Sequence, residues 1–165
     1  MEKVDKLDLK ILGIISQNAR IPFKDVAEEC GVSRAAIHQR VQRLIKLGVI
    51  TGSGYHVDPR AVNFSTCAFV NISLERASMC RQVATELEKI PEIVECHFST
   101  GHYMLFVKVY CKDNEHLKNL LGKSIQSIEG VKSTETFISL EQTFTRTISV
   151  PVPEEEKKTR QTKKK

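Results

Sequence analysis

The sequence contains no tryptophan, few aromatic residues and no long apolar run. No stretch approaches the roughly 20 consecutive apolar residues that a membrane-spanning helix needs, so we expect no transmembrane segment and no membrane partner. The first ten residues, MEKVDKLDLK, mix acidic and basic side chains and lack the apolar core of a secretory signal. We therefore expect the chain to stay in the cytosol.

Cysteine and histidine occur five times each, and neither follows a ligand pattern. The five cysteines are an odd number and lie at least 13 residues apart, which predicts neither a disulfide framework nor a metal site. We interpret them as reduced, mostly buried small residues. The five histidines form no metal-spaced pair, and no serine or cysteine lies in a recognisable nucleophile motif. We predict no metal, no cofactor and no catalytic residue. An enzyme is kept as an alternative because small ferredoxin-like domains can be catalytic. His97 and His102 could approach each other at a turn between strands, but a structural or sensing role is favoured for them.

The surplus of positive charge is concentrated at the two ends of the chain. Residues 1–58 contain nine Lys and Arg against seven Asp and Glu, and residues 154–165 contain six against three. Residues 59–153 are balanced, with ten of each. A neutral middle part with basic ends favours polyanion binding at the ends, although solubility alone could also explain the total of +5.

Two amphipathic helices are predicted in the first 30 residues. Residues 8–17 and 23–30 place apolar side chains at helical spacing, and Asp5 or Asp8 is available as the N-cap of the first helix. Gly31 follows the second helix, where a residue that tolerates positive φ is favoured. A glycine turn of this length before a third helix indicates a helix-turn-helix.

The third helix is predicted to begin after Ser33, a good N-cap, and to end near Gly48. Past Gly48, two short β-capable runs, 49–51 and 55–57, flank a Gly-Ser-Gly turn and indicate a small wing or a hinge. The helix has an apolar stripe that should face inward. This stripe consists of Ile37, Val41, Leu44 and Ile45.

The opposite side of this third helix is basic, because residues 31–50 contain four basic residues and no acidic one. An α-helix fits the DNA major groove, and the N-terminal half of a recognition helix contacts base edges. We therefore predict Arg34, His38 and Gln39 as base readers, since Arg can bind guanine through two hydrogen bonds and Gln can bind adenine. Charged helix faces are often merely solvated, which is the alternative interpretation.

Phosphate contacts are predicted further along the same helix, at Arg40, Arg43 and Lys46. Arg40 could instead brace the domain internally. The complete set of predicted DNA-binding residues is Ser33, Arg34, His38, Gln39, Arg40, Arg43 and Lys46.

The second half of the chain alternates strand and helix signals. The element order βαββαβ is that of the ferredoxin-like sandwich, in which two helices cover one face of a four-stranded sheet. The predicted fold class is thus α+β, with a winged helix-turn-helix domain followed by a ferredoxin-like domain. Strands are predicted at 66–74, 93–100, 103–111 and 131–140, and helices at 79–90 and 114–128.

Both faces of the predicted sheet are partly apolar, although two helices can cover only one of them. In 67–74 and 103–110, apolar side chains occur at both alternating sets of positions. A second copy of the chain in two-fold symmetry would cover the other face, and we predict a homodimer.

An RNA-recognition module shares the βαββαβ order and is an alternative function. Such modules stack bases on aromatic residues of two central strands. Phe106 fits one stacking position, but Met104 stands where a second aromatic residue belongs and Tyr103 where a glycine belongs. The sequence therefore favours DNA over RNA.

The first half of the chain resembles a known family. The stretch LDLKILGIISQNARIPFKDVAEECGVSRAAIHQRVQRLIKLGVITG resembles the N-terminal domain of the Lrp/AsnC (feast/famine) family of prokaryotic transcription regulators. The segments IPEIVECHFSTGHYMLFVKV and GVKSTETFISL resemble its ligand-sensing and assembly domain. The resemblance implies a sequence-specific regulator of double-stranded DNA, located in the cytoplasm at the nucleoid. It also implies dimerisation through the βαββαβ domains and frequent assembly into octamers.

The resemblance further implies that an amino-acid effector binds between neighbouring dimers. The family's sensing loop typically reads Gly-Asp-Tyr-Asp, whereas residues 101–104 read Gly-His-Tyr-Met, so an ammonium group would lose its charge partners. The two threonines of the GVKSTET segment match the family's pocket threonines and could hold a carboxylate. The site could recognise a different effector, more anionic or more apolar, or it could have lost ligand binding. The predicted effector-binding residues are Gly101, His102, Tyr103, Met104, Thr134 and Thr136.

Four segments are predicted along the chain. The tail, PVPEEEKKTRQTKKK, has no core-forming residue after Val152, so we expect it to be disordered, and it could add non-specific attraction to DNA. The segments are a helix-turn-helix DNA-binding domain at 1–58, a linker at 59–65, a ferredoxin-like ligand-sensing and oligomerisation domain at 66–150, and the basic tail at 151–165.

Overall fold

The structure, a computed structural model, describes residues 4–151 of the chain. These residues form two compact units. The helical unit contains residues 4–56 together with 145–151, and the sheet unit contains Val57–Phe144. Apart from Pro151, the predicted basic tail lies outside the described residues. Within the described range, no helix is both long and apolar enough to cross a membrane.

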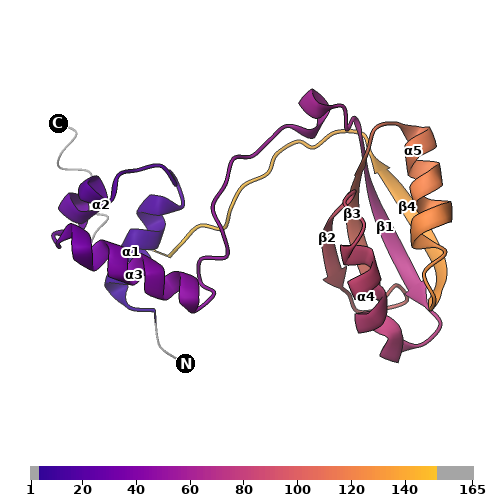
Figure 1. Ribbon diagram of the computed structural model, residues 1–165, viewed down its shortest axis with the longest axis horizontal. Helices are drawn as coiled ribbons and strands as arrows, with labels where there is room; N and C mark the ends of the chain where they lie inside the picture. Colours follow the sequence, from indigo (N-terminus) through magenta and orange to yellow (C-terminus); the bar gives the residue numbers. More distant parts are fainter. Residues whose placement is uncertain (1–3, 152–165) are drawn as a thin grey trace. The chain divides into compact units, whose positions relative to one another are not determined.

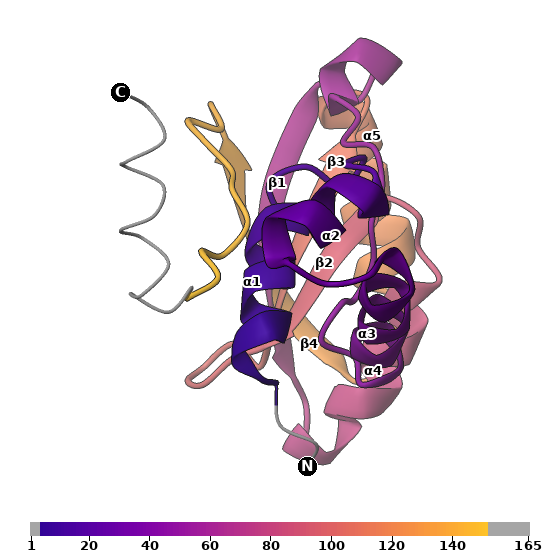
Figure 2. The ribbon, with the colours of Figure 1, turned by 90° about the vertical axis from the view of Figure 1, so that its left-hand side faces the viewer.

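The helical unit is built from α1 (Lys6–Ile15), α2 (Phe23–Cys30) and α3 (Arg34–Lys46) (Figures 1 and 2). Helix α1 begins two residues earlier than predicted because Asp5 is its N-cap. The Asp8 backbone N–H donates to Asp5 Oδ1 at 2.8 Å, and the Asp5 N–H donates to Asp8 Oδ2 at 3.0 Å. This reciprocal capping box satisfies N–H groups that have no partner inside a helix.

The turn between α2 and α3 has the predicted geometry. Gly31 has a φ of 68°, in the left-handed region, and Ser33 Oγ accepts a hydrogen bond from the Ala36 backbone N–H at 3.2 Å. Ile45 was predicted to be buried, and this was wrong, because its side chain is 46% exposed. It lies one residue past the buried Leu44 and therefore roughly 100° around the helix from it. The core of the unit consists of Ile11, Ile14, Val26, Ala27, Ile37 and Val41.

The segment after α3 does not form a wing of paired strands within the described residues. The Val49 and Ile50 backbone N–H groups donate to the Leu44 carbonyl at 2.9 and 3.2 Å, so the first β-capable run closes the end of α3. The second run forms no strand either. Its Tyr55 ring lies 4.2 Å from the guanidinium carbon of Arg20, a cation–π contact inside the helical unit.

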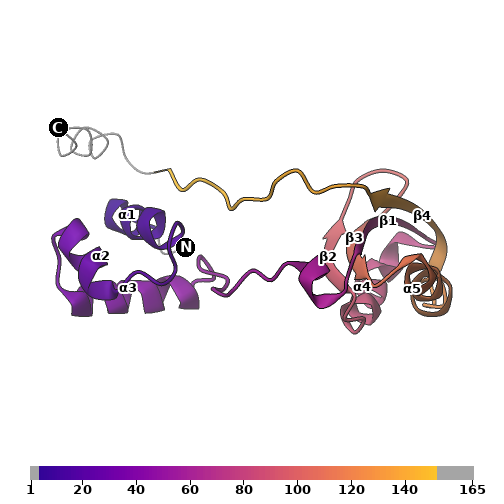
Figure 3. The ribbon, with the colours of Figure 1, turned by 90° about the horizontal axis from the view of Figure 1, so that it is seen from above.

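The sheet unit has the predicted βαββαβ order. Its strands follow the spatial order β2-β3-β1-β4, and each pair of neighbours is antiparallel. Figure 3 shows α4 and α5 on the same side of the sheet. The elements are β1 (Thr66–Leu74), α4 (Cys80–Glu88), β2 (Ile93–Phe98), β3 (Leu105–Cys111), α5 (Asn114–Asn119), the π-helical segment η3 (Leu120–Ile125) and β4 (Val131–Ser139), with 3-10 turns η1 (Pro59–Val62) and η2 (Ala77–Met79).

The core of the sheet unit lies between the sheet and its two helices. The sequence left open which face of β1 and β3 is covered, and the structure turns one fully apolar face of both strands toward α4 and α5. The buried residues are Ala68, Val70, Ile72, Leu74, Val83, Leu87, Leu105, Val107, Val109, Cys111, Leu117, Leu120 and Ile125.

The connection between β2 and β3 is longer than the sequence predicted. Gly101 has a φ of 106°, and the Ser99 backbone N–H donates to the Met104 carbonyl at 3.0 Å. These features close a loop, so β2 ends at Phe98 and β3 begins at Leu105. The loop is attached to β1, because the Met104 N–H donates to the Ile72 carbonyl at 3.0 Å.

Candidate DNA-binding and effector sites

The predicted base readers lie on exposed positions of α3. Arg34 and Gln39 are exposed, whereas Ile37 between them is fully buried in the core. His38 is also exposed, and its ring packs edge-on against Phe23 of α2, with the ring centroids 6.2 Å apart. The core contact of α3 therefore fixes the orientation of the helix and presents its N-terminal half to solvent. Ser33 and Lys46, at the two ends of the helix, are exposed as well.

Arg40 and Arg43 lie on α3 and are half-buried. Both contact acidic residues at the start of α1. Arg40 Nη1 lies 2.6 Å from Asp5 Oδ2 and 2.8 Å from Asp8 Oδ1. Arg43 Nη2 bonds to Asp8 Oδ2. These four residues are called the Asp8 cluster below. They form an ion network that joins the first helix of the unit to its third.

Burial determines the chemistry of the Asp8 cluster. Asp8 is fully buried, and a buried carboxylate is stable only when its charge is paired. The pKa of Asp5 is held below its ordinary value, mainly by the hydrogen bond from Arg40 and to a smaller extent by the one from the Asp8 backbone N–H. Hydrogen bonds to Asp5 and Asp8 raise the pKa of Arg40 in turn. Two of the four positive charges between residues 31 and 50 are thus matched by the carboxylates of Asp5 and Asp8.

Sequence reasoning left both roles for Arg40 open, and it missed the acidic partners. Asp5 and Asp8 were recognised only as possible caps, since their pairing with α3 spans 32 to 35 residues of chain. The sequence did contain a hint of these partners: Arg40 and Arg43 lie about one helical turn apart, beside the apolar stripe of α3. A helical arginine that borders the core needs a partner from a neighbouring element.

The predicted effector residues come from the β2–β3 loop and from β4. In the loop, the His102 and Tyr103 rings meet edge-on with centroids 4.8 Å apart. A hydrogen bond with the Glu135 carboxylate of β4 raises the pKa of the Tyr103 hydroxyl. Thr134 of β4 pairs with Ile72 of β1, the residue whose carbonyl also accepts from the Met104 N–H of the loop. The loop that begins at Gly101 and the middle of β4 therefore both reach the same part of β1.

The six predicted effector residues do not all share one face of the sheet. Side chains alternate along a strand, so Thr134 and Thr136 point to the face opposite that of Glu135, which binds Tyr103. Thr134 Oγ1 accepts a hydrogen bond from Gln126 Nε2 at 2.8 Å. Gln126 directly follows η3, and sequence reasoning did not identify it. No local pattern around Gln126 indicated this role, because its partner Thr134 lies in a different element, β4.

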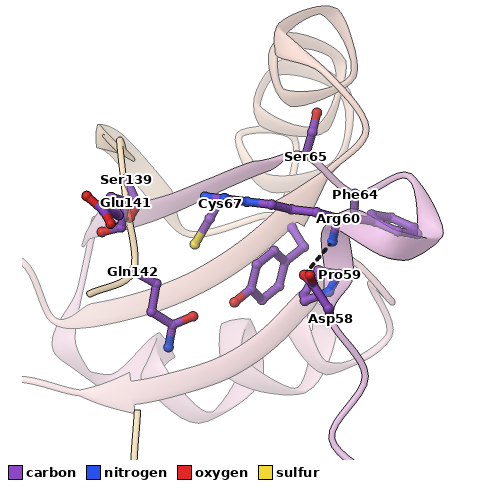
Figure 4. Close-up of a pocket in the computed structure, with 10 residues that line it drawn as sticks. Asp58, Pro59, Arg60, Phe64, Ser65, Cys67, Ser139, Glu141 and Gln142 are labelled. Carbon is purple, nitrogen blue, oxygen red and sulfur yellow. Dashed lines mark hydrogen bonds between the residues drawn. The ribbon is translucent and has the colours of Figure 1, made fainter. Parts of the chain in front are cut away.

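A separate hollow of about 240 Å³ lies at the beginning of β1 (Figure 4). None of the predicted effector residues lines it. Asp58 Oδ1 accepts from the Arg60 backbone N–H at 3.0 Å at its rim, and the Arg60 side chain extends toward Cys67. No pattern in the sequence indicated this hollow. It is lined by Asp58, Pro59, Arg60, Phe64, Ser65, Cys67, Tyr110, Ser139, Glu141 and Gln142.

The sheet face away from α4 and α5 carries aromatic side chains. The Phe69 and Phe106 rings stack with centroids 5.5 Å apart, and Phe137 pairs with Phe69 in the strand register. Phe137 is 52% exposed. Lys108 Nζ binds Glu95 Oε1 at 3.3 Å beside them. This face therefore presents an apolar patch, defined by Phe69, Phe106 and Phe137, with an ion pair at its side.

The five cysteines are free thiols, and they are less buried than predicted. Cys111 alone is fully buried, whereas Cys96 is exposed and the remaining three are half-buried. Burial raises the pKa of the Cys67 and Cys96 thiols, and it raises that of Cys111 to about 11. These thiols are therefore protonated near neutral pH. No group of three or more His, Cys, Asp and Glu within residues 4–151 could hold a metal ion.

Comparison with known proteins assigns both units. A winged helix-turn-helix DNA-binding model matches residues 4–51, and an Lrp/AsnC ligand binding domain model matches residues 67–148. The regulatory protein AsnC of Haemophilus influenzae is 36% identical over 148 residues, which cover 90% of this chain and 99% of that protein. The chain belongs to the Lrp/AsnC family. It is an Lrp/AsnC-type DNA-binding transcriptional regulator, which confirms the predicted family and function.

Solved structures of Lrp/AsnC proteins have the same fold. The structure of E. coli AsnC matches with a TM-score of 0.81 and 35% identity, over 89% of this chain and 99% of that one. A feast or famine regulatory protein from M. tuberculosis, solved in complex with L-methionine, matches with a TM-score of 0.83 and 26% identity, over 90% and 100% of the two chains. The predicted α+β fold with a helix-turn-helix and a ferredoxin-like domain is confirmed.

Proposed function

We propose that this Lrp/AsnC-type regulator binds duplex DNA as a homodimer, with α3 of each protomer in the major groove. The observation that carries the proposal is the exposed N-terminal half of α3, which has basic and amide side chains but no acidic one. A helix of this kind fits the groove, and two-fold symmetry requires a roughly palindromic site with half-sites spaced by helical turns. The regulator then acts in the cytoplasm, at the nucleoid.

The residues of α3 divide into two groups in this proposal. Arg34 and Gln39 contact base edges, and His38, packed against Phe23, is a third base reader. Ser33 and Lys46 contact phosphates at the two ends of the helix. Arg40 and Arg43 contribute less to phosphate binding than their charge suggests, because the carboxylates of Asp5 and Asp8 neutralise them.

Single substitutions on specific and random duplex test this division. Arg34→Ala should weaken binding to the best site by about 1 to 3 kcal/mol and relax its sequence preference. Lys46→Ala should weaken binding to both duplexes alike and lower the salt slope by about one for each phosphate that the side chain no longer binds. Equal losses on both duplexes for Arg34→Ala would show that Arg34 does not contact a base. RNA of the same length serves as a competitor that separates DNA binding from the RNA alternative.

The homodimer is proposed to form through the apolar patch of Phe69, Phe106 and Phe137. Two helices cover the other face of the sheet, whereas no helix of residues 4–151 covers the stacked aromatic pair on this face. Burying the patch against its symmetry copy removes apolar surface from water in both protomers at once. Association of dimers into octamers, as the family resemblance implies, would use further surfaces of the sheet unit. Light scattering at micromolar concentration measures both states.

An amino acid is the proposed effector, bound near Thr134 and completed by a neighbouring dimer. The M. tuberculosis relative was solved with L-methionine, an apolar amino acid. Thr134 Oγ1 accepts from Gln126, which leaves its own O–H free to donate to a carboxylate, and Thr136 lies on the same face of β4. His102 and Met104 replace the carboxylates of the family loop. Calorimetry with the twenty amino acids tests this site, and a complete absence of heat would favour loss of effector binding.

A further inference from the structure

The two carboxylates that hold Arg40 differ in how easily they can give it up. Asp8 is fully buried and also bonds to Arg43, so it remains paired whether or not Arg40 moves. Asp5 lies at the surface, with 49% of its side chain exposed, and Arg40 itself is 30% exposed. Water can solvate Asp5 after its partner leaves. The Asp5–Arg40 contact can therefore be exchanged, and Asp8 keeps Arg43 as a partner when Arg40 moves.

A phosphate group is chemically the nearest substitute for the Asp5 carboxylate. Both are oxyanions that bind one edge of a guanidinium, and both contacts are charge-assisted hydrogen bonds. Arg40 uses only Nη1 for Asp5 and Asp8, and its other donors have no hydrogen-bond partner in the part of the chain that the structure describes. Arg40 follows Gln39 by one position, roughly 100° around α3, so it lies on a flank of the helix. The flanks of a helix in the major groove face the phosphates that border the groove.

We propose that Asp5 competes with DNA phosphate for Arg40 and thereby limits the affinity of the protein for any duplex. This inference rests on the proposed placement of α3 in the groove and names a further residue that sets affinity and specificity there. When Asp5 is paired with Arg40, one positive charge in each helical unit does not contribute to non-specific DNA binding. The base readers in the N-terminal half of α3 then account for a larger share of the binding free energy.

Asp5→Asn is the test substitution because it removes the charge and keeps the cap. Asparagine caps helices as well as aspartate does, and its side-chain oxygen can still accept from the Asp8 N–H. Asp8 stays paired with both arginines in this variant. In the full-length protein, Asp5→Asn should bind random and specific duplex more tightly, by about fivefold or more at 0.1 M salt. The slope of log K against log salt should steepen by about 0.9 for each protomer on the DNA.

Two comparisons separate this competition from a general effect of charge. Asp113→Asn makes the same change at another cap, the N-cap of α5, where Asp113 accepts from the His116 N–H at 2.7 Å. Arg40→Met removes the guanidinium for which Asp5 and DNA phosphate compete, and Arg43 still pairs with Asp8. We expect Asp113→Asn to keep the wild-type salt slope, and Arg40→Met alone to lower it only slightly, because Asp5 already pairs with Arg40. The double variant with Asp5→Asn and Arg40→Met should lose the gain of Asp5→Asn.

The outcomes distinguish the inference from the proposed function. A steeper slope for Asp5→Asn that disappears in the double variant supports competition at Arg40. Wild-type slopes for Asp5→Asn, or a gain that persists without Arg40, overturn the inference and leave DNA binding by α3 intact. A wild-type protein that binds no duplex overturns both. Circular dichroism of each variant, with helix content equal to that of the wild type, shows that the helical unit is folded in these measurements.

Discussion

Replacing Arg40 and Arg43 separately and together tests whether the buried carboxylate of Asp8 determines the stability of the helical unit. Methionine is the replacement because it keeps an apolar stem without charge or hydrogen-bond donors. With either arginine removed, Asp8 still has the other as its partner. With both removed, a fully buried carboxylate has no cation within the Asp8 cluster.

The expected magnitudes differ because exposed and buried charges have different solvation costs. Each arginine is about one-third exposed, with side-chain exposures of 30% and 33%, so a single replacement should cost about 1 kcal/mol. Removing every partner of a buried charge costs about 3 to 5 kcal/mol. The double replacement should therefore exceed the sum of the single ones by about 1 to 3 kcal/mol, which is a coupling that neighbouring residues commonly show.

The coupling is measured by urea unfolding of the full-length variants, followed by circular dichroism at the helical wavelength. Hydrogen exchange of the α1 amides identifies the helical unit as the part that opens, because Asp8 belongs to the first turn of α1. Additive losses, with the double variant near 2 kcal/mol, would show that Asp8 has enough solvent or other partners to stay charged alone. That result would refute the assignment of Asp8 as an obligatorily paired charge.

Three further predictions concern other parts of the molecule. Gly130→Ala should destabilise the sheet unit by more than about 1 kcal/mol in thermal unfolding. The φ of Gly130 is 95°, and the added Cβ would lie 2.5 Å from Met79 Cε. Gly122→Ala should cost less, because no atom lies near the Cβ it would add. The pKa of Asp5 in the folded protein is lowered from 3.8. The ionised Asp5 carboxylate therefore stabilises the fold fully at pH values well above 3.8, and this stabilisation is lost as the pH falls below 3.8. The urea midpoint of the helical unit should drop over the same pH range. Phe137→Glu should shift the homodimer toward monomers in sedimentation velocity.

Each of these predictions has a contrary result. Equal melting temperatures for the two glycine variants would mean that Met79 moves aside and that the backbone at Gly130 tolerates a side chain. If Asp5→Asn loses as much stability between pH 6 and pH 3 as the wild type, the acid sensitivity arises from other carboxylates. A Phe137→Glu protein that stays dimeric would place the interface elsewhere on the sheet unit.

Local signals in the sequence were sufficient for most of the fold. Gly31 and Ser33 predicted the turn and the start of α3 because a left-handed residue and an N-cap depend only on neighbouring backbone groups. The run 66–74 predicted the bounds of β1, but both of its faces are partly apolar, so the alternation did not decide which face is buried. The prediction that Ile45 is buried was wrong because the spacing of apolar residues along a helix does not show where the buried face ends.

Long-range contacts were beyond this kind of prediction. The pairing of Asp8 with Arg40 and Arg43 depends on how α1 packs across α3, and no spacing rule connects residues more than 30 positions apart. Gln126 and Thr134 are only 8 positions apart, but one follows η3 and the other lies in β4, so no helix or strand spacing connects them. Family resemblance named Thr134 but could not name Gln126. The sequence therefore predicted which elements carry the candidate sites better than it predicted the partners of their side chains.

The most direct test of α3 as the DNA-reading element is a methylation-protection experiment on a genomic fragment retained by the purified protein in dilute buffer. Methylation of guanine N7 reports contacts in the major groove, where this atom is exposed. We expect two protected guanine patches separated by a whole number of helical turns, and loss of protection within each patch for Arg34→Ala. Retention of no fragment, or full reactivity of every guanine N7 in a bound complex, would contradict the account.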